Sequence, residues 1–427
     1  MMQLNQDTMQ LKPIVNYLTD TDLYKFTMDQ LFLHKYPWVS GEYYFLCRNE
    51  GTVFTPAMKV EIDEQIKHLC TLTMTEEELE YLRTIRFLKP DYIEFLRIWR
   101  PLPNYVTTYL NADGSLTIKV SGPLYMAMHF EIYVLEIVNE VYFRMNYDYD
   151  ELEKQARRKL KAKVEALNNN KYTFKFAEFG ARRRLSFEWQ AEVVRELVAT
   201  GKCVGTSNVK LACDNNVPAI GTFAHELVQM YQGIPGINLA YINHYVLRDW
   251  IDEYGGDLGT ALTDTIGTEM FFMVLTLEEA KLLSGFRHDS GDPIAWGEYV
   301  LAQLKRIGLT DEEIKNKLLL FSDSLNFDKA QKIYDYFKDR CKVSFGIGTF
   351  LSNDTDVEPL NIVVKLQFVT VNGRRTPVAK LSDAPGKTLC QVPEFVDTLK
   401  SVIAHEKTIN NVPSLAVYNQ KYNLAYL

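Results

Sequence analysis

The sequence lacks the features that mark membrane and secreted proteins. Its apolar runs are short and interrupted by charges, so none approaches the roughly 20 residues that a membrane helix requires. The first residues, MMQLNQDTMQLKP, have no basic start followed by an apolar core and do not resemble a secretory signal. We therefore expect a protein without a membrane segment that works in the cytoplasm.

Cysteine is scarce and scattered. The six cysteines include no C-x-x-C pair, which indicates reduced core thiols and neither a disulfide framework nor a zinc site. They stand at positions 47, 70, 203, 213, 341 and 390.

An excess of positive charge is also missing. Lys and Arg number 47 against 55 Asp and Glu, which leaves a net charge of −8. This balance argues against a general nucleic-acid surface and against an anionic-membrane surface. Any bound anion must therefore be met by a local basic pocket.

No Pro, Gly or Ser tract indicates a flexible linker. Hydrophobic residues at 47% and charged residues at 24% are typical of a globular protein, so the chain is expected to fold throughout. Because 427 residues exceed what one core usually organises, we expect two closely packed units.

The N-terminal part mixes helical and strand patterns. Residues 16–122 contain helix-like stretches such as DLYKFTMDQLFLHKY and alternating stretches such as GEYYFLCR and SLTIKVSG. These patterns predict an α+β domain over residues 1–130. A long helical pattern then runs from MAMHFEIYVLEIVNEVYFRM into DELEKQARRKLKAKVEAL and is expected to connect to the second unit.

From Lys171 onward, short apolar runs repeatedly end in small polar residues and give way to helical patterns. Examples are KCVGTS with NVKLACD, VPAIGT with FAHELVQMY, and KLLLFSDS with LNFDKAQKIYDYF. Strand then helix, repeated this often, predicts an α/β fold with a parallel (β/α) barrel within residues 131–360; a doubly wound open sheet is the alternative. After Asn361, NIVVKLQFVTVNG and TPVAKLSD have strand character without helices between them, so we expect residues 361–427 to complete the smaller α+β domain.

Five Gly-Thr pairs occur mostly where a predicted strand hands over to a helix. Glycine lets the backbone approach a phosphate closely, threonine offers a hydroxyl, and the helix that follows presents free amides. In a barrel these loops share the C-terminal face, where active sites are built. Each pair alone also makes an ordinary turn or helix cap. The pairs are Gly205-Thr206, Gly221-Thr222, Gly259-Thr260, Gly267-Thr268 and Gly348-Thr349.

His225 stands just after one of these pairs, in GTFAHELVQ. A zinc-protease motif H-E-x-x-H needs a second histidine, and Gln229 occupies that position, so this metal site is excluded. What remains is a histidine at the start of a helix, where amides can hold a phosphoryl group carried on the ring. A structural histidine is the alternative.

Acids and an arginine end several of the predicted strands. Arg287 and Asp289 alternate in GFRHDSGDP, so both side chains are expected to point into one pocket. Arginine binds carboxylate or phosphate oxygens, and aspartate suits a ribose hydroxyl, hydrated Mg²⁺ or a positively charged sugar carbon. Asp264 in ALTDT and Asp323 in LLFSDS end two further runs. A buried structural ion pair is the alternative for Arg287.

Two basic segments supply local positive charge. Arg182, Arg183 and Arg184 follow FAEFG, although they also suit a solvated helix start. The segment LSDAPGKT resembles the end of a P-loop, but Leu381 replaces the first glycine, which excludes that motif. Lys380 and Lys387 remain candidates for contacting a phosphate.

Taken together, the motifs resemble those of the nicotinate phosphoribosyltransferase family, relatives of the nicotinamide enzymes in the type II phosphoribosyltransferase group. The resemblance spans almost the whole chain and includes TDTDLYKFTMDQ, EFGARRRLSFEWQ, GTSNVKLA, PAIGTFAHE, ALTDT, FRHDSGDP, LLLFSDSLN, FGIGTFLSND and VAKLSDAPGK. It implies an irregular barrel, a smaller domain assembled from both ends of the chain, and a homodimer with shared active sites.

The resemblance also implies roles for single residues. Phe179 resembles the aromatic that stacks on the pyridine ring, and Tyr24 a second ring partner that can come from the other subunit. His225 matches a histidine phosphorylated by ATP, and Asp264 the acid that orients its ring. The remaining matches concern ribose and phosphate binding at Arg287, Asp289, Asp323, Gly348 and Thr349, and basic residues reaching in from the partner subunit at Arg48, Lys380 and Lys387. Arg182 is a further candidate for substrate binding.

One departure bears on the substrate. Nicotinamide-using relatives have an aspartate where this chain has Ser207. A carboxylate there would repel the carboxylate of nicotinate in a desolvated pocket, and serine removes that repulsion. Thr206, Ser207 and Arg287 are then expected to hydrogen-bond the substrate carboxylate.

The implied reaction transfers phosphoribosyl from phosphoribosyl pyrophosphate to nicotinate, giving nicotinate mononucleotide and pyrophosphate. ATP would act as co-substrate by phosphorylating His225, which makes the enzyme formally a ligase, and Mg²⁺ would be held mainly through pyrophosphate and water. Nicotinamide and quinolinate remain alternative substrates. An aldolase or isomerase acting on a sugar phosphate, and a non-catalytic nucleotide sensor, are alternatives from other classes.

Overall fold

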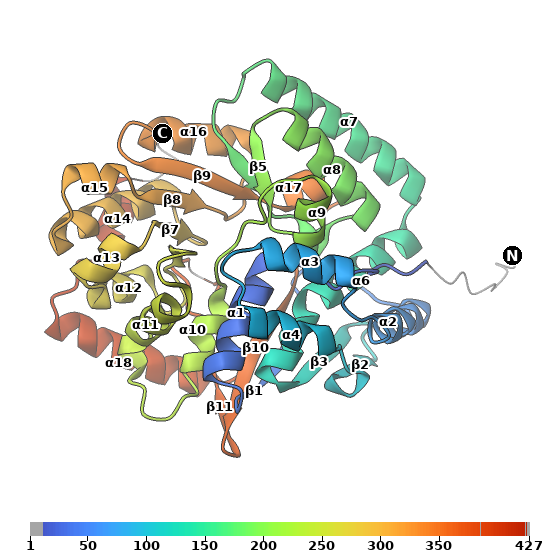
Figure 1. Ribbon diagram of the computed structural model, residues 1–427, viewed down its shortest axis with the longest axis horizontal. Coiled ribbons are helices and arrows are strands. Elements are labelled where there is room, and N and C mark those ends of the chain that lie inside the picture. The colour runs from blue at the N-terminus through green and yellow to red at the C-terminus, as the bar shows by residue number, and fades with distance from the viewer. Residues whose placement is uncertain (1–11, 385, 423, 425–427) are drawn as a thin grey trace, which may run out of the picture.

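The computed structural model describes residues 12–384, 386–422 and 424. Most of the N-terminal segment inspected for a secretory signal lies outside these residues. The described chain contains two sheets, one of five strands and one of six. Figure 1 shows them in different parts of the molecule, with β1, β10 and β11 in one part and β7, β8 and β9 in the other.

The five-stranded sheet joins segments from both ends of the chain. Its strands follow the order β11-β10-β1-β3-β2, and every neighbouring pair is antiparallel. The strands are β1 (Ser40–Cys47), β2 (Val106–Leu110), β3 (Leu116–Pro123), β10 (Ile362–Val371) and β11 (Arg374–Pro377). The strand character predicted after Asn361 is therefore confirmed, and β10 pairs directly with β1.

The six-stranded sheet is parallel, with the order β5-β4-β9-β8-β7-β6. Its strands are β4 (Phe176–Glu178), β5 (Cys203–Thr206), β6 (Thr260–Leu262), β7 (Gly285–His288), β8 (Leu318–Phe321) and β9 (Lys342–Ile347). β4 pairs with β5 on one side and with β9 on the other, so the first and the last strands of the barrel are neighbours. This strand order fits a ring and not a doubly wound sheet.

Residues 217–222 lie between the two edge strands of this sheet. The predicted strand VPAIGT forms only an isolated bridge, Ala219 with Thr206, since Pro218 has no amide hydrogen to donate to a ladder. Ile220 N donates to Thr206 O at 2.8 Å, and the Thr222 hydroxyl donates to Thr260 O at 2.8 Å. The segment thus bridges β5 and β6 irregularly, which confirms the irregular (β/α) barrel.

The helices of the first part are α1 (Leu23–Lys35), α2 (Pro56–Leu69), α3 (Glu76–Thr84), α4 (Pro90–Ile98), α5 (Leu124–Ala127), α6 (Phe130–Asn146) and α7 (Tyr149–Asn168). Those of the barrel are α8 (Phe187–Ala199), α9 (Val209–Asp214), α10 (His225–Tyr231), α11 (Ile242–Tyr254), α12 (Thr268–Val274), α13 (Leu277–Leu282), α14 (Pro293–Ile307), α15 (Asp311–Lys315), α16 (Phe327–Phe337) and α17 (Thr349–Ser352). Near the C-terminus lie α18 (Pro393–Ile409) and α19 (Leu415–Lys421), and the 3₁₀ helices are η1 (Pro103–Tyr105), η2 (Ala181–Arg183) and η3 (Leu239–Tyr241).

The long helical pattern forms two helices. α6 is buried along most of its length and packs against α2, β10 and η2, so it links the antiparallel sheet to the barrel. The helical conformation is interrupted at Tyr147 and Asp148, and Asp148 caps α7 by accepting a hydrogen bond from Glu151 N at 3.2 Å.

The C-terminal helices lie against the barrel helices. α18 contacts α12 and η3, and α19 contacts α14, so the segment after residue 392 does not lie wholly on the antiparallel sheet. The division of the chain into residues 1–130, 131–360 and 361–427 stays a prediction.

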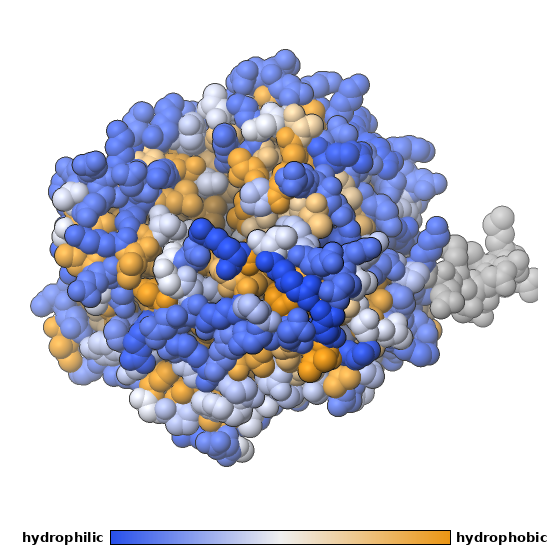
Figure 2. All heavy atoms as spheres, viewed as in Figure 1, coloured by the Kyte–Doolittle hydropathy of each residue, from blue (hydrophilic) through white to orange (hydrophobic). Residues whose placement is uncertain are grey.

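The face seen in Figure 2 is mostly hydrophilic, with hydrophobic residues scattered between hydrophilic ones. In the described part of the chain, no helix combines the length and the apolar character needed to cross a membrane. All six cysteines are free.

Candidate active site

The barrel brings seven groups of predicted site residues to the carboxyl ends of its strands and of the irregular segment. Because parallel strands end at one edge, residues far apart in the sequence become neighbours there. Phe179 follows β4, Ser207 follows β5, His225 follows the irregular segment, Asp264 follows β6, Asp289 follows β7, Asp323 follows β8, and Gly348 with Thr349 follows β9.

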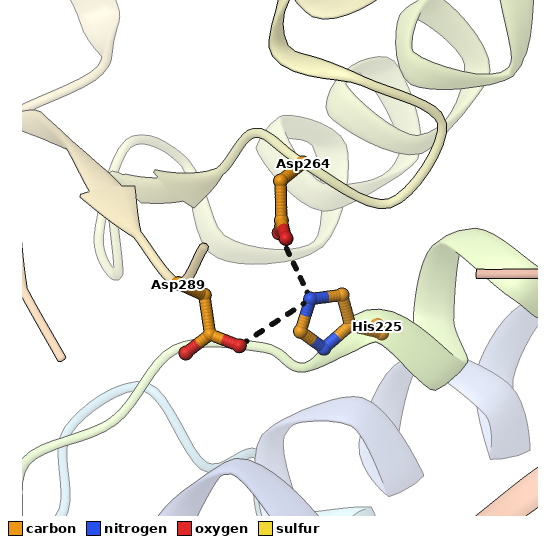
Figure 3. A group of neighbouring side chains, drawn as sticks. All are labelled: His225, Asp264 and Asp289. Atoms are coloured by element: carbon orange, nitrogen blue, oxygen red, sulfur yellow. Dashed lines mark hydrogen bonds and ion pairs between the residues drawn. The ribbon is translucent and has the colours of Figure 1, made fainter. Parts of the chain in front are cut away.

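His225 lies between two carboxylates (Figure 3). Its Nε2 is 2.9 Å from Asp264 Oδ1 and 3.5 Å from Asp289 Oδ2. The other ring nitrogen, Nδ1, points away from both carboxylates in Figure 3 and makes no hydrogen bond with the described residues. His225 is the first residue of α10 and is 5% exposed. This geometry fixes the ring through one nitrogen and leaves the other available for chemistry.

Arg287 and Asp289 do point into one site, as their alternation in the sequence predicts. The Arg287 guanidinium is 3.0 Å from Asp289 Oδ1, and its Nε donates to Ser322 Oγ at 3.0 Å. The Asp289 side chain is 21% exposed and that of Arg287 is 17% exposed, so neither group is sealed in the core. Both remain accessible to a ligand at the strand ends.

Lys380 and Lys387 join the site from the segment after β11. The Lys380 ammonium is 3.5 Å from Asp264 Oδ2 and 3.6 Å from Asp289 Oδ2, and Lys387 donates to Asp323 Oδ2 at 2.7 Å. The resemblance implied that both lysines come from the partner subunit. That expectation is wrong for these contacts, because each lysine reaches carboxylates of its own chain.

The segment that carries these lysines is tied to the barrel by its backbone and by Asp383. Leu381 N donates to Thr265 O at 2.8 Å, and Thr268 donates from its amide and its hydroxyl to the Asp383 carboxylate at 3.0 and 2.6 Å. Burial and the nearby charge of Asp264 raise the pKa of Asp383 to about 7. These contacts hold the two lysines at the strand ends.

The electrostatics keep His225 neutral and its partners ionised. Burial and the positive charge of Lys380 lower the pKa of His225 to about 4, against the opposing effect of Asp264. Burial alone would raise the pKa of Asp264, but His225, Lys380 and the hydrogen bond from Ser290 bring it well below its usual range. At neutral pH Nε2–H therefore donates to Asp264, and Nδ1 keeps its lone pair.

The donor atoms of His225, Asp264 and Asp289 lie within 4.8 Å of one another, which is close enough for one metal ion. However, Lys380 and Arg287 already balance these carboxylates, and Mg²⁺ prefers oxygen ligands in octahedral geometry. The residues present suit a hydrated Mg²⁺ with Asp289 as one ligand better than a cage made only of protein groups.

A second group of site residues surrounds Tyr24 and Arg182. The Arg182 guanidinium hydrogen-bonds the Tyr24 hydroxyl, and its Cζ lies 5.4 Å from the Tyr24 ring centroid. Arg182 also faces Asp22 at 3.7 Å and Glu131 at 3.9 Å, with its side chain 32% exposed. Tyr24 is 6% exposed, so its ring offers little free face, and its clearest contact is the one that orients Arg182.

Thr206 and Ser207 are already committed as donors. The Thr206 hydroxyl donates to Glu178 Oε2 at 2.7 Å, and the Ser207 hydroxyl donates to Asp22 Oδ1 at 2.5 Å. A hydroxyl has one proton, so neither group has a hydrogen left for a substrate carboxylate. The expected role of these two residues is corrected accordingly. Although Ser207 replaces the aspartate of the nicotinamide-using relatives, the carboxylate of Asp22 lies beside Ser207 and again puts a negative charge there. Arg182 is the cation that faces Asp22.

Phe179 is half-buried, and its ring lies against the backbone of β9. A Cβ built on Gly346 would come within 2.2 Å of two carbons of the Phe179 ring. Glycine at this position therefore makes the space that the ring occupies. Gly348, the residue before α17, faces the Phe179 carbonyl, whose oxygen would lie 2.7 Å from a Cβ built on this glycine.

Arg48 is not brought to the His225 cluster. It lies exposed just after β1, where its amide donates to Asn361 O at 3.0 Å. Among the described residues, no hydrogen bond or ion pair joins it to His225, Asp264 or Asp289, and its part in ligand binding stays a prediction.

A buried polar framework under the Phe179 loop was missed by the sequence reasoning. Arg184, 0% exposed, makes a two-pronged bond to Asp20 at 2.6 and 2.7 Å, and Asn208 donates to the same carboxylate at 2.7 Å. Glu136 lies 3.2 Å from Arg184 and is also fully buried. This framework ties the N-terminal segment to the loops after β4 and β5. Its signals in the sequence were the repeated Thr-Asp in TDTD and Arg184, whose alternative interpretation as a solvated residue is wrong because the side chain is buried.

Replacing Arg184 by leucine should lower the free energy of unfolding by about 3–5 kcal/mol, because Asp20 and Glu136 would lose their buried cation. Urea unfolding followed by circular dichroism measures the change. Arg195 is exposed and, among the residues that the structure describes, pairs only with Glu196 at 3.6 Å; the control variant Arg195→Leu should change stability by less than about 0.5 kcal/mol. Equal free energies of unfolding for the two variants would show that the framework does not stabilise the fold by this amount.

Comparison with known proteins places the chain in a family. The model of the "Nicotinate phosphoribosyltransferase (NAPRTase) family" matches residues 174–407, and that of its N-terminal domain matches residues 19–139. Proteins named nicotinate phosphoribosyltransferase from Acinetobacter baumannii and Herminiimonas arsenicoxydans are each 44% identical, covering 93% and 92% of this chain and 99% of their own.

Solved structures give the same result. The nicotinate phosphoribosyltransferase of Porphyromonas gingivalis is 35% identical with a TM-score of 0.83, covering 91% of this chain and 100% of that one. The enzyme of Vibrio cholerae is 32% identical with a TM-score of 0.82, covering 97% and 98%. The chain belongs to the nicotinate phosphoribosyltransferase family.

Proposed function

We propose that this protein transfers phosphoribosyl from phosphoribosyl pyrophosphate to nicotinate, in a reaction stimulated by ATP through phosphorylation of His225. The observation that carries the proposal is the meeting of His225, Asp264, Asp289, Arg287 and Lys380 at the strand ends of one barrel, in a member of this family. The products would be nicotinate mononucleotide and pyrophosphate, a step in NAD biosynthesis.

Ring binding is assigned to Phe179 and Arg182. Phe179 offers a flat apolar face that stacks on a heteroaromatic ring without demanding a particular substituent. Arg182 offers a planar fork to the nicotinate carboxylate, and the Tyr24 hydroxyl orients it. Since Thr206 and Ser207 donate elsewhere, the charge of Arg182 becomes the main basis for preferring nicotinate over nicotinamide.

Gly346→Ala should displace the Phe179 ring and lower kcat/KM for nicotinate by about 10- to 100-fold, since small misplacement of a positioning group has effects of that size. Initial rates at varied nicotinate measure this. The KM for phosphoribosyl pyrophosphate should stay near the wild-type value, because the added methyl group meets the ring and not the sugar site. An unchanged KM for nicotinate would show that Phe179 does not bind the nicotinate ring.

Transfer is assigned to the groups at the ends of β7 and β8. The pyridine nitrogen attacks C1 of the ribose, the new C–N bond forms, and the C–O bond to pyrophosphate breaks. The carbon becomes cation-like, and the ionised Asp289, with Asp323 on the ribose, favours that charge. Arg287, Lys380 and Lys387 offset the charge growing on pyrophosphate. Bound Mg²⁺ would supply further neutralisation of the leaving group.

The histidine chemistry follows from its hydrogen bond. Nδ1 takes the γ-phosphoryl group, the bond from phosphorus to the ADP oxygen breaks, and ADP leaves. The ring becomes positively charged while its Nε2–H continues to donate a hydrogen bond to Asp264, and the Asp264 carboxylate stabilises the positive charge of the ring. The phosphoryl group, with about −2 charge, then changes the forces on Lys380 and Arg287. Hydrolysis of the N–P bond returns the enzyme to its starting state.

The pH dependence of phosphorylation should reflect the lowered pKa of His225, about 4. Protonation of the ring would remove the attacking lone pair, so labelling by radioactive ATP in short reactions should stay level from pH 8 to about pH 5 and fall only as pH approaches 4. An ordinary histidine would already lose half its rate near pH 6.5. Alkaline quenching preserves the label, and a midpoint near 6.5 would contradict the assigned environment.

Product analysis tests the proposed function as a whole. The purified full chain, given nicotinate, phosphoribosyl pyrophosphate, ATP and Mg²⁺, should form nicotinate mononucleotide and pyrophosphate in equal amounts, separated by ion-exchange chromatography. Sugar-phosphate cleavage or isomerisation without pyridine consumption would replace the proposal. A homodimer sharing its active sites, with Arg48 of each subunit acting in the other, is part of the same proposal.

A further inference from the structure

A fully buried lysine lies between two acids beside the site. Lys25 in α1 is 0% exposed, its ammonium is 2.7 Å from Glu131 Oε2, and it also bonds Glu226 Oε1. Glu131 and Glu226 are 4% and 6% exposed. Tyr43 also lies close to Glu226, and Lys25 is the cation that is bonded to this buried carboxylate and balances its charge.

Lys25 and Glu226 each directly follow a residue of the candidate active site. Lys25 follows Tyr24, which bonds Arg182, and Glu226 follows His225 at the start of α10. Glu131 adds a second connection, because it faces Lys25 at 2.7 Å and Arg182 at 3.9 Å. An unbroken line of contacts therefore runs from the imidazole helix through Glu226, Lys25 and Glu131 to the guanidinium.

We propose that the Lys25–Glu226 ion pair is the link through which the phosphorylation state of His225 sets the affinity for nicotinate, so that both residues are positioning residues. The inference rests on the proposed function. It adds the route by which one part of the site acts on another, and neither residue needs to touch a substrate.

Burial makes the pair suited to this role. Because the pair is shielded from water, the Glu226 carboxylate cannot replace its ammonium partner with solvent when it is displaced. If α10 shifts, either Lys25 moves with Glu226 or the broken ion pair raises the free energy of the protein steeply. Burial alone would lower the pKa of Lys25, but Glu131 and Glu226 raise it, and the ammonium stays charged at neutral pH. α1 is also tied to the barrel at Thr27, whose hydroxyl donates to Thr222 O at 2.6 Å.

The test compares the KM for nicotinate with and without ATP, together with acid-labile labelling of His225. Glu226→Gln removes one charge and keeps the shape, and the double variant Lys25→Met/Glu226→Gln removes both charges of the pair, with Lys365, 3.4 Å from Glu131, left to balance that second acid. Both variants should be labelled as the wild type is, while the ratio of KM without ATP to KM with ATP falls to within twofold of one. A purely structural role would change both KM values by one factor and leave the ratio unaltered.

Lys35→Met is the matched control, because Lys35 lies in the same helix and pairs with Asp249 at 3.1 Å and Asp252 at 3.3 Å away from the site. It should keep the wild-type ratio. Variants that keep that ratio while labelling normally would overturn the link but leave the proposed function standing. A wild-type protein without label and without any ATP effect on KM would overturn both.

Discussion

His225→Ala should abolish ATP-dependent labelling and all stimulation by ATP, yet retain slow transfer without ATP. The reason is that Nδ1 of His225 is the proposed phosphoryl acceptor, whereas the sugar site is built by other residues. Coupling energies between sites commonly correspond to about 5- to 150-fold in affinity, so in the presence of ATP the KM for nicotinate should rise by a factor in that range. Initial rates and label retention after alkaline quench measure the two effects.

His244 offers the control for this experiment. It is a partly exposed histidine in α11, 3.6 Å from Glu279, and His244→Ala should keep both label and stimulation. Normal labelling of the His225→Ala protein would show that another residue accepts the phosphoryl group.

Asp289→Asn should lower kcat by about 100- to 1000-fold, the usual result of removing one preorganised electrostatic group from a reaction centre. Burial would raise the pKa of Asp289, but Arg287, Lys380 and His225 lower it well below its ordinary value, so the wild-type group is a carboxylate at every working pH. The amide keeps the shape and removes the negative charge that favours the cation-like carbon. Steady-state kinetics with saturating nicotinate and phosphoribosyl pyrophosphate give the number.

Asp252→Asn removes a charge of the same kind at a site that is 61% exposed and should leave kcat unaltered. If Asp289→Asn changed only the KM for phosphoribosyl pyrophosphate, Asp289 would be a binding group without a part in the chemical step.

The sequence was sufficient for the barrel strands other than VPAIGT and for the residues at the strand ends. Apolar runs ending in small polar residues mark Asp264, Asp289 and Asp323, and parallel strands then bring these positions to one edge without further information. His225 was recognisable because a Gly-Thr turn precedes it and Gln229 excludes the zinc motif. Local pattern and topology together therefore predicted most of the cluster in Figure 3.

Contacts between distant segments were not predictable in the same way. The position of Lys380 depends on the backbone bond of Leu381 to Thr265, more than 100 residues away, which no local pattern encodes. Ser207 was assigned to the substrate because its bond to Asp22 across 185 residues could not be seen. The break between α6 and α7 was missed because Asp148 acts as a cap inside a continuous helical pattern.

The most direct test of the central claim is pyrophosphate release with nicotinate, nicotinamide and quinolinate, each with and without ATP. Release should be fast with nicotinate, stimulated by ATP, and weak with the other two acceptors, because Arg182 meets one carboxylate beside a ring held by Phe179. Equal release with nicotinamide, or none with any acceptor, would contradict the account.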